Sequence, residues 1–258
     1  MDLAMQGVDF RYPLRLRDLN RDLGQRKNMF QGLTWSVPAR EPVVLLGPNG
    51  AGKSTLLRLL AGDLSPRRGH VALGGSTASP AELRRRVAWM PQTVTAVPGL
   101  TVSEQVAYAG WLGGLKESVA QARATETVVQ VGLEAERDQQ SSVLSGGQLR
   151  RVGLAEALVL HADHLLLDEP MAGLDPAQRG NFRSILMSLP PCGLVVSTHQ
   201  TDDVAEVFER VTVLADGGIR FDGSVAQFEA LAPAAAVGGR SSSVVDRAFA
   251  TFVAGGRH

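Results

Sequence analysis

The residues most able to do chemistry form one glycine-rich stretch, Gly47–Thr55, which reads Gly-Pro-Asn-Gly-Ala-Gly-Lys-Ser-Thr. The apolar run Val43–Leu46 precedes it, and the leucine-rich run 56–60 follows it. This order predicts a buried strand, a turn and a helix, as in the phosphate-binding loop G-x-x-x-x-G-K-[ST]. The glycines let successive backbone N–H groups point at one anion, and the helix directs the positive end of its dipole at the same place. The stretch therefore predicts a binding site for nucleotide phosphates.

Each residue of this loop is a candidate for nucleotide contact: Gly47, Pro48, Asn49, Gly50, Ala51, Gly52, Lys53, Ser54 and Thr55. Lys53 can reach the β- and γ-phosphates, and the Ser54 hydroxyl can ligate Mg²⁺. The alternative is a glycine-rich turn that contains a lysine by chance. The strand and helix that flank the loop in the expected order favour the phosphate site.

Two acids end another apolar run, Leu165-Leu166-Leu167-Asp168-Glu169. In proteins with a phosphate loop, a buried strand delivers an acid to the metal ion, on the side opposite the loop Ser or Thr, and Asp168 fits that position. Glu169 lies one residue further, where it could accept a proton from an attacking water. Taken alone, the pair is equally compatible with solvated turn residues; the loop at Gly47 favours the metal and base roles.

A third feature, Ser145-Gly146-Gly147-Gln148, precedes a segment with helical periodicity. Two glycines and a serine at a helix N-terminus can make a second anion site. They are also what an ordinary serine N-cap with loop glycines looks like, and these residues alone do not decide between the two.

Composition excludes several classes of protein. The 258 residues suit one large domain, or one domain with a satellite, and the formal charge of +0 gives no electrostatic reason to expect a nucleic-acid partner. The single cysteine, Cys192, excludes an internal disulfide and fits a reducing compartment. No apolar run approaches the ~18 residues of a membrane-spanning helix, and the N-terminus lacks the features of a signal peptide. We therefore expect any membrane association to occur through a partner.

The pattern of elements predicts an α/β fold. Apolar runs at 41–46, 87–90, 164–167, 193–198 and 210–215 alternate with helical segments, which argues for a mainly parallel sheet with helices on both faces. Shorter strands are expected at 3–12, 29–37, 71–73 and 219–221, the last as the first half of a hairpin. Between residues 92 and 160 only helices are expected, and Thr101 with Glu104 forms a capping-box pattern.

Three segments are expected along the chain. Residues 1–91 and 161–223 form the core, residues 92–160 a helical insertion, and residues 224–258 a linker, rich in alanine, glycine and serine at 233–243, with a short helix at 244–253. The arginine-rich stretch 14–28 reads as a loop or an exposed amphipathic turn, and residues 201–208 read as a helix.

Taken together, these features resemble the nucleotide-binding subunit of ATP-binding cassette (ABC) transporters, over about Leu3 to Gly223. Gly47–Thr55 matches the Walker A motif, Gln92 the Q-loop, Leu144–Gln148 the LSGGQ signature, Leu165–Glu169 the Walker B motif with the catalytic glutamate, Ala172–Asp175 the D-loop, and Ser197–His199 the switch-histidine loop. The signature discriminates, because Walker motifs alone occur in many unrelated NTPases. The resemblance implies a P-loop NTPase (RecA-like) core with a parallel sheet, an N-terminal antiparallel β subdomain and an inserted α-helical subdomain.

The resemblance also implies cofactors and roles. ATP and Mg²⁺ would be bound, with Ser54, Gln92 and Asp168 at the metal. Glu169 would be the general base, His199 would hold the γ-phosphate, and Gln92 would contact Mg²⁺ or the attacking water. Tyr12 would stack on the adenine ring, or alternatively be a strand-end tyrosine packed on the core.

Partners follow from the signature motif. Ser145, Gly146, Gly147 and Gln148 would bind ATP held by another cassette, which implies a two-fold dimer with two ATP molecules at its interface. The second nucleotide-binding subunit is expected to be an identical copy, although the sequence leaves a paralogue open. The other implied partner is an integral membrane permease subunit, which would hold the chain on the cytoplasmic, inner face of the cell membrane.

The most specific expectation concerns the direction of transport. Residues 97–108 and 198–204 resemble the export group that handles drugs, antibiotics and polysaccharides, so export is favoured over import. Two further alternatives are a soluble ABC ATPase acting on ribosomes or DNA, and a non-hydrolysing nucleotide sensor, which would lack Glu169 or His199. The chain departs from the family pattern at four positions, none of them catalytic: Arg40, Leu149, Glu156 and Gln200.

Overall fold

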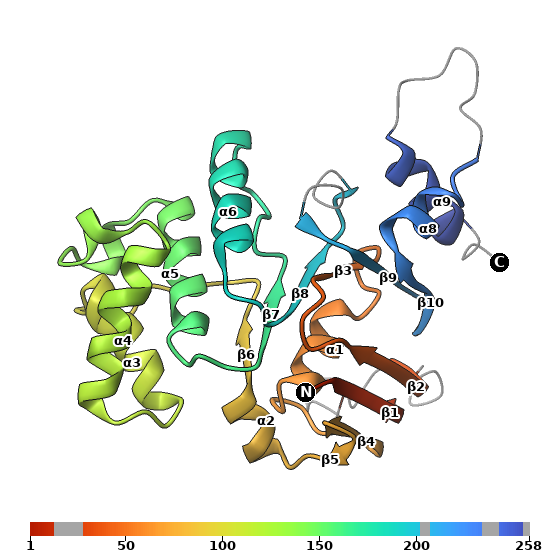
Figure 1. The fold of residues 1–258 in the computed structure, drawn as a ribbon, viewed down its shortest axis with the longest axis horizontal. Helices are drawn as coiled ribbons and strands as arrows, with labels where there is room; N and C mark the ends of the chain where they lie inside the picture. The colour runs from red at the N-terminus through yellow and green to blue at the C-terminus, as the bar shows by residue number, and fades with distance from the viewer. Residues whose placement is uncertain (13–27, 202–206, 234–242, 255–258) are drawn as a thin grey trace, which may run out of the picture.

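The computed structural model describes residues 1–12, 28–201, 207–233 and 243–254. The expected arginine-rich loop at 14–28, the helix at 201–208 and the linker at 233–243 therefore lie mostly outside the described residues. The remaining elements form two sheets with helices around them (Figure 1).

The larger sheet has six strands in the order β10-β9-β3-β8-β7-β6. Strands β9, β3, β8, β7 and β6 pair in parallel, and β10 pairs with β9 in antiparallel orientation. Their bounds are Val43–Leu46 (β3), Val87–Met90 (β6), His164–Asp168 (β7), Gly193–Thr198 (β8), Arg210–Ala215 (β9) and Gly218–Ser224 (β10). The last expected strand is thus the second half of a hairpin with β9 and not the first half, because Gly217 at φ +72° turns the chain directly back.

Alternation along the central strands explains why helices cover both faces. In β3, Val43 and Leu45 belong to one apolar core, while Val44 and Leu46 belong to the other. All four are fully buried, because successive side chains of a strand point to opposite faces. A parallel strand with helices on both sides reads as a continuous apolar run for this reason, as β3 and β7 do.

The smaller sheet is antiparallel, with the strand order β2-β1-β4-β5. It consists of Leu3–Phe10 (β1), Phe30–Val37 (β2), Arg68–Leu73 (β4) and Ser76–Thr77 (β5). Apolar side chains of β1 and β2 share one core with helix α1 (Lys53–Leu60) and with one face of the larger sheet. The smaller sheet therefore supports the helix that follows the glycine-rich loop.

Residues 92–160, all of which are described, contain only helices and turns apart from one isolated bridge between Thr101 and Gln140. Helices α3 (Val102–Leu112), α4 (Glu117–Gln130) and α5 (Gly146–Leu158) pack together at one end of the molecule (Figure 1). Short 3-10 turns lie at Glu134–Glu136 and Ser141–Val143. The predicted capping box of α3 is confirmed: Glu104 N–H donates to Thr101 Oγ1 and Thr101 N–H to Glu104 Oε2.

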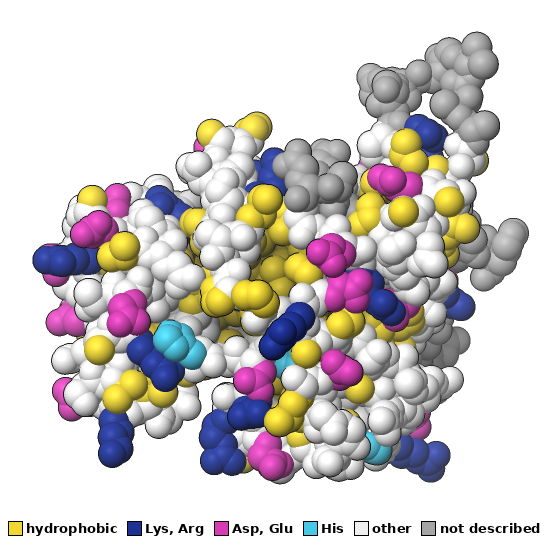
Figure 2. Space-filling model, in the orientation of Figure 1, with side chains coloured by type: hydrophobic (Ala, Val, Ile, Leu, Met, Phe, Trp, Pro, Cys, Tyr) yellow, Lys and Arg dark blue, Asp and Glu magenta, His cyan; other side chains and the backbone are white. Residues whose placement is uncertain are grey.

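The other helices are α2 (Pro80–Arg86), α6 (Pro176–Ser188), α8 (Val225–Glu229) and α9 (Val244–Ala254). The expected C-terminal helix is therefore present, and it packs on α8 and β9. Helix α8 was not expected from the sequence. On the face shown in Figure 2, basic and acidic side chains are interspersed.

Candidate functional site

Four candidate segments meet at one edge of the larger sheet. Strands β3, β8, β7 and β6 are neighbours and run parallel, so their carboxyl ends lie side by side. These ends lead to Gly47, His199, Glu169 and Gln92, respectively. Ligands of open α/β sheets bind outside the carboxyl ends of the strands, and the topology alone therefore brings these residues to one place.

The glycine-rich loop has the backbone geometry of an anion cradle. Gly50 and Gly52 adopt φ values of +83° and +101°, which strongly favour glycine. A Cβ atom on Gly47 would lie 2.5 Å from the backbone oxygen of Leu214, so β9 leaves no room for a side chain there. Gly52 is the N-cap of α1 and has no side chain to occupy the first N–H groups of the helix. These groups suit an anion.

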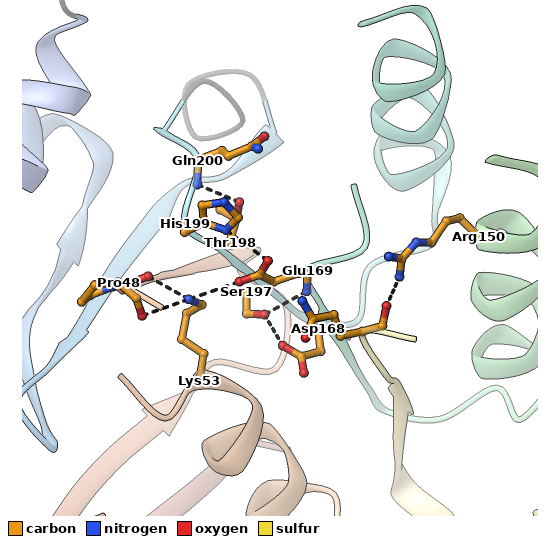
Figure 3. A network of polar contacts seen from close by, with 11 residues as sticks. Pro48, Lys53, Arg150, Asp168, Glu169, Ser197, Thr198, His199 and Gln200 are labelled. Atoms are coloured by element: carbon orange, nitrogen blue, oxygen red, sulfur yellow. Dashed lines mark hydrogen bonds and ion pairs between the residues drawn. The ribbon is translucent and has the colours of Figure 1, made fainter. Parts of the chain in front are cut away.

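Lys53 supplies a buried positive charge beneath this loop. Its side chain is 5% exposed, and Nζ donates to the backbone oxygens of Gly47 at 2.7 Å and Pro48 at 3.4 Å. Nζ also lies 3.3 Å from Glu169 Oε1 (Figure 3). A cation held at the start of a helix, beside cradle N–H groups, is the donor set that phosphate oxygens require.

The two acids at the end of β7 are held by a serine on the next strand. Ser197 is fully buried, and its hydroxyl donates to Asp168 Oδ1 at 2.7 Å while accepting from the Glu169 N–H at 3.0 Å (Figure 3). Asp168 pairs with Ser197 in the β7–β8 register, which places the hydroxyl between the acids. Glu169 has φ +47°, a conformation that costs a non-glycine residue about 1–2 kcal/mol.

Ser197→Ala should therefore lower the free energy of unfolding by about 1–3 kcal/mol, because the buried Asp168 carboxylate loses a hydrogen-bond donor. Urea unfolding measures this effect. Ser184→Ala is the matched control, since its exposed hydroxyl donates only within its own helix, to the Gly180 oxygen at 3.0 Å. Equal stability of the two variants would show that Ser197 does not support the acids.

His199 and Gln92 complete the cavity. His199 Nδ1 lies 3.0 Å from Glu169 Oε2, so Glu169 contacts an imidazole on one oxygen and the Lys53 ammonium on the other. The backbone oxygen of Gln92 accepts a hydrogen bond from Arg150 Nη1 of α5. Burial lowers the pKa of the Arg150 guanidinium, while the charges of Glu169 and Asp168 raise it.

The residues present fit a nucleoside triphosphate with Mg²⁺. A cavity of about 500 Å³ is lined by residues 49–55 together with Gln92, Glu169, Ala172 and His199. Among the described residues, no three His, Cys, Asp or Glu side chains gather to hold a metal. Mg²⁺ commonly takes one or two carboxylates with phosphate oxygens and water, so Ser54 and Asp168 suit that ion when phosphate is bound.

The other candidates lie outside the lining of this cavity: Gly47, Pro48, Asp168, Tyr12 and residues 145–148. Tyr12 is 44% exposed, donates or accepts a hydrogen bond with Thr55 Oγ1 at 2.9 Å, and packs edge-on against Phe10. Ser145 and Gln148 form a capping box at the start of α5, with Ser145 Oγ accepting from the Gln148 N–H. The Ser145 hydroxyl proton is not used in that bond and can still be donated to an anion.

This arrangement defines a class of protein: a nucleotide-binding α/β fold with a phosphate loop, a buried acid pair and a helical segment inserted before β7. A family model described as ABC transporter matches residues 30–172, more than half of the chain. The chain belongs to the ABC transporter family and is an ATPase of the kind that this family uses.

Similar proteins carry several functions. The cobalt import ATP-binding protein CbiO of Rhodobacter capsulatus is 39% identical over 202 residues, which cover 75% of this chain and 72% of that protein. The thiamine import ATP-binding protein ThiQ of Yersinia pseudotuberculosis is 38% identical, covering 80% of this chain and 89% of that protein. The daunorubicin/doxorubicin resistance ATP-binding protein DrrA of Streptomyces peucetius is 35% identical, covering 77% of this chain and 61% of that protein.

Solved structures support the fold. An ATP-binding subunit of an ABC transporter has a TM-score of 0.77 and 24% identity, covering 98% of this chain and 100% of that chain. A bacterial ABC transporter cassette solved as a dimer has a TM-score of 0.74 and 23% identity, covering 86% of this chain and 98% of that chain. Because relatives include both import and drug-resistance proteins, the export subgroup suggested by the sequence is not confirmed.

Some residues of the site were not expected from the sequence. The sequence indicates Ser197 only as part of the switch-histidine loop, and its link to Asp168 depends on strand register, which the sequence does not display. For Arg150 the only signal in the sequence is a basic side chain just after the first turn of a helix that starts next to Ser145, and such a side chain is more often solvated.

Proposed function

We propose that this chain is the ATP-hydrolysing subunit of a transporter, dimerises on ATP, and drives transport through separate membrane subunits. The observation that carries the proposal is the cavity in which Lys53 and His199 both contact Glu169 beside the glycine-rich loop. A protein that only senses nucleotide would not need a glutamate held between a lysine and a histidine beside the position of the γ-phosphate.

Each residue has a proposed role in hydrolysis. Loop N–H groups and Lys53 bind the β- and γ-phosphates, and Ser54 with Asp168 would hold Mg²⁺, which neutralises charge on the phosphates when bound. Glu169 accepts the proton of the attacking water, His199 donates to the γ-phosphate, and Gln92 orients the water or the metal. Ser197 keeps both acids in place.

The dimer follows from the two separate anion sites. Ser145 and the first N–H groups of α5 would bind the γ-phosphate of an ATP held by the loop of a second copy. An isologous pair completes both composite sites at once. The Ser145 hydroxyl proton and the backbone N–H of Gly146 support this proposal, because a Cβ atom on Gly146 would meet nothing within 4 Å, whereas the Gln178 side chain packs against Gly147.

The permease is proposed to dock in a groove between α2 and α3. This groove of about 800 Å³ is lined by Asp63, Arg84, Arg85, Trp89 and Leu112, among others. Leu112 exposes an apolar side chain at the α3 side of the groove, where it is 64% exposed. A short permease helix with an apolar face and an acidic residue would complement this surface. The described part of the chain has no helix long and apolar enough to cross a membrane, so the location at the inner face is proposed to depend on this contact.

Leu112→Glu should therefore shift the protein from the membrane fraction to the soluble fraction when it is produced in its own cells, because a charge would be buried in the groove. Met187→Glu is a matched control, as Met187 is 66% exposed and also lies near the end of its helix, α6. Purified Leu112→Glu should keep its ATPase activity. Equal membrane fractions for both variants would contradict docking at this groove, and co-sedimentation with ribosomes would support the soluble alternative.

We propose export as the direction, with import as the alternative. Residues 97–108 resemble export cassettes, and a drug-resistance relative supports this direction. Relatives named for cobalt, molybdenum, thiamine and taurine import support the alternative. Genes for a polytopic permease next to this one would inform the choice, since the cargo contacts lie in the membrane partner.

A further inference from the structure

One face of α5 holds the segment that directly follows Gln92. Residues Arg150, Gly153 and Glu156 are three apart and therefore share a face of the helix. Arg150 Nη1 donates to the Gln92 backbone oxygen. A Cβ atom on Gly153 would lie 2.3 Å from Val94 Cγ2, so the segment packs directly onto the helix backbone.

Glu156, the third of these residues, accepts a hydrogen bond from Gln105, a buried glutamine on α3. Gln105 is 1% exposed and its side-chain amide is fully engaged. Its Oε1 accepts from the Val97 N–H at 2.8 Å, and its Nε2 donates to the Thr95 oxygen at 3.1 Å and to Glu156 Oε1 at 2.6 Å. Residues 92–97 are thus fixed at four points by two helices. Burial raises the pKa of Glu156, and the hydrogen bond from Gln105 opposes that shift.

We infer that Gln105, Gly153 and Glu156 are positioning residues for ATP hydrolysis, because they fix the segment after Gln92 and so set where Gln92 enters the nucleotide cavity. This inference rests on the proposed role of Gln92. Glu156 accepts a hydrogen bond from Gln105 and so holds the amide that bonds to residues 95 and 97. None of the three residues lines the cavity or would touch ATP.

The first test introduces a steric clash between residue 153 and Val94 and then removes it by shortening Val94. Gly153→Ala favours the helix itself, because alanine has a higher helix propensity than glycine, yet it places a methyl group against Val94. Val94 is β-branched and stiff, so the segment must shift. We expect the kcat for Mg²⁺-dependent ATP hydrolysis to fall about tenfold, since small misplacements near a reacting centre can cost up to about 10²-fold, with the KM for ATP changed less than about twofold. The double variant Gly153→Ala with Val94→Ala should recover most of the lost kcat.

The second test removes the amide clamp. Gln105→Met has a similar length but cannot make the three hydrogen bonds, so hydrogen exchange of the Val97 N–H should accelerate and kcat should again fall about tenfold. Glu156→Gln keeps an acceptor for Gln105 and should stay near wild-type. Thr127→Val is the matched control, because Thr127 is also 1% exposed and bonds only within its own helix, to the Arg123 oxygen.

The outcomes are distinguishable. Faster exchange at Val97 without a loss of kcat would overturn the positioning role, as would failure of Val94→Ala to rescue Gly153→Ala while both variants remain folded. An equal loss of kcat in Thr127→Val would also overturn it, since the effect would then reflect general destabilisation. A failure of the proposed ATPase mechanism would appear separately, as full activity in Glu169→Gln.

Discussion

Replacing Glu169 with glutamine should lower the rate of ATP hydrolysis by about 10²–10⁴-fold and leave ATP binding nearly unchanged. Glutamine has the same shape and can turn its carbonyl oxygen toward Lys53 and its amide N–H toward His199 Nδ1, which accepts in one tautomer, but it cannot accept the proton of water at neutral pH. The loss should therefore appear in kcat, with ATP affinity within a few-fold of the wild-type value.

This prediction is measured by phosphate release at saturating Mg²⁺ and ATP, together with equilibrium binding of a fluorescent ATP analogue. Glu126→Gln on the exposed face of α4 is the control for a loss of one negative charge. Wild-type turnover in Glu169→Gln would assign the base to another group. A parallel loss of binding and turnover would indicate that Glu169 holds the loop and does not take part in the chemistry.

Lys53→Ala should weaken ATP binding about 10- to 100-fold and abolish measurable hydrolysis. A hydrogen bond to a charged group contributes about 1.5–3 kcal/mol, which corresponds to that range of affinity. Lys53 is buried and sits where its ammonium can move from the Gly47 and Pro48 oxygens to phosphate oxygens. Isothermal titration with Mg²⁺ and ATP measures the change.

The matched control for Lys53 is Lys116→Ala, which removes an exposed lysine before α4. The thermal unfolding temperature without nucleotide should also be compared, because Lys53→Ala removes the Lys53–Glu169 ion pair, while the Glu169 contact with His199 Nδ1 remains. An unchanged ATP affinity in a folded Lys53→Ala protein would contradict a phosphate site at the loop.

The sequence predicts the strands of the larger sheet where the signal is local, and the structure brings several of the candidate site residues together at the ends of those strands. Strands such as β3 and β7 are continuous apolar runs between turns, and the glycines of the loop have few other uses. The structure places these segments at neighbouring strand ends. Helix α8 shows a local signal that was overlooked: Ser224 and Gln227 form a capping box, and serine followed three residues later by glutamine is legible in the sequence.

Other features depend on contacts between distant residues. The hydroxyl of Ser197 reaches Asp168 only because β7 and β8 pair in a particular register. Gln105 and Glu156 lie 51 residues apart, and neither residue type is commonly buried. From the sequence, both side chains would be assigned to solvent-exposed helix faces. Only the packing of α3 on α5 brings them together. Chemistry-bearing motifs are thus legible in the sequence, while the side chains that position them are not.

The central claim is that one ATP lies between two copies of this chain, with Gly47–Thr55 on one side and Ser145–Gln148 on the other. The most direct measurement is a crystal structure of Glu169→Gln grown with ATP and Mg²⁺. Our account predicts a two-fold dimer in which Ser145 Oγ of one copy lies within hydrogen-bond distance of the γ-phosphate bound by Lys53 of the other. A dimer in which the Ser145–Gln148 segment faces solvent or a different ligand would contradict it.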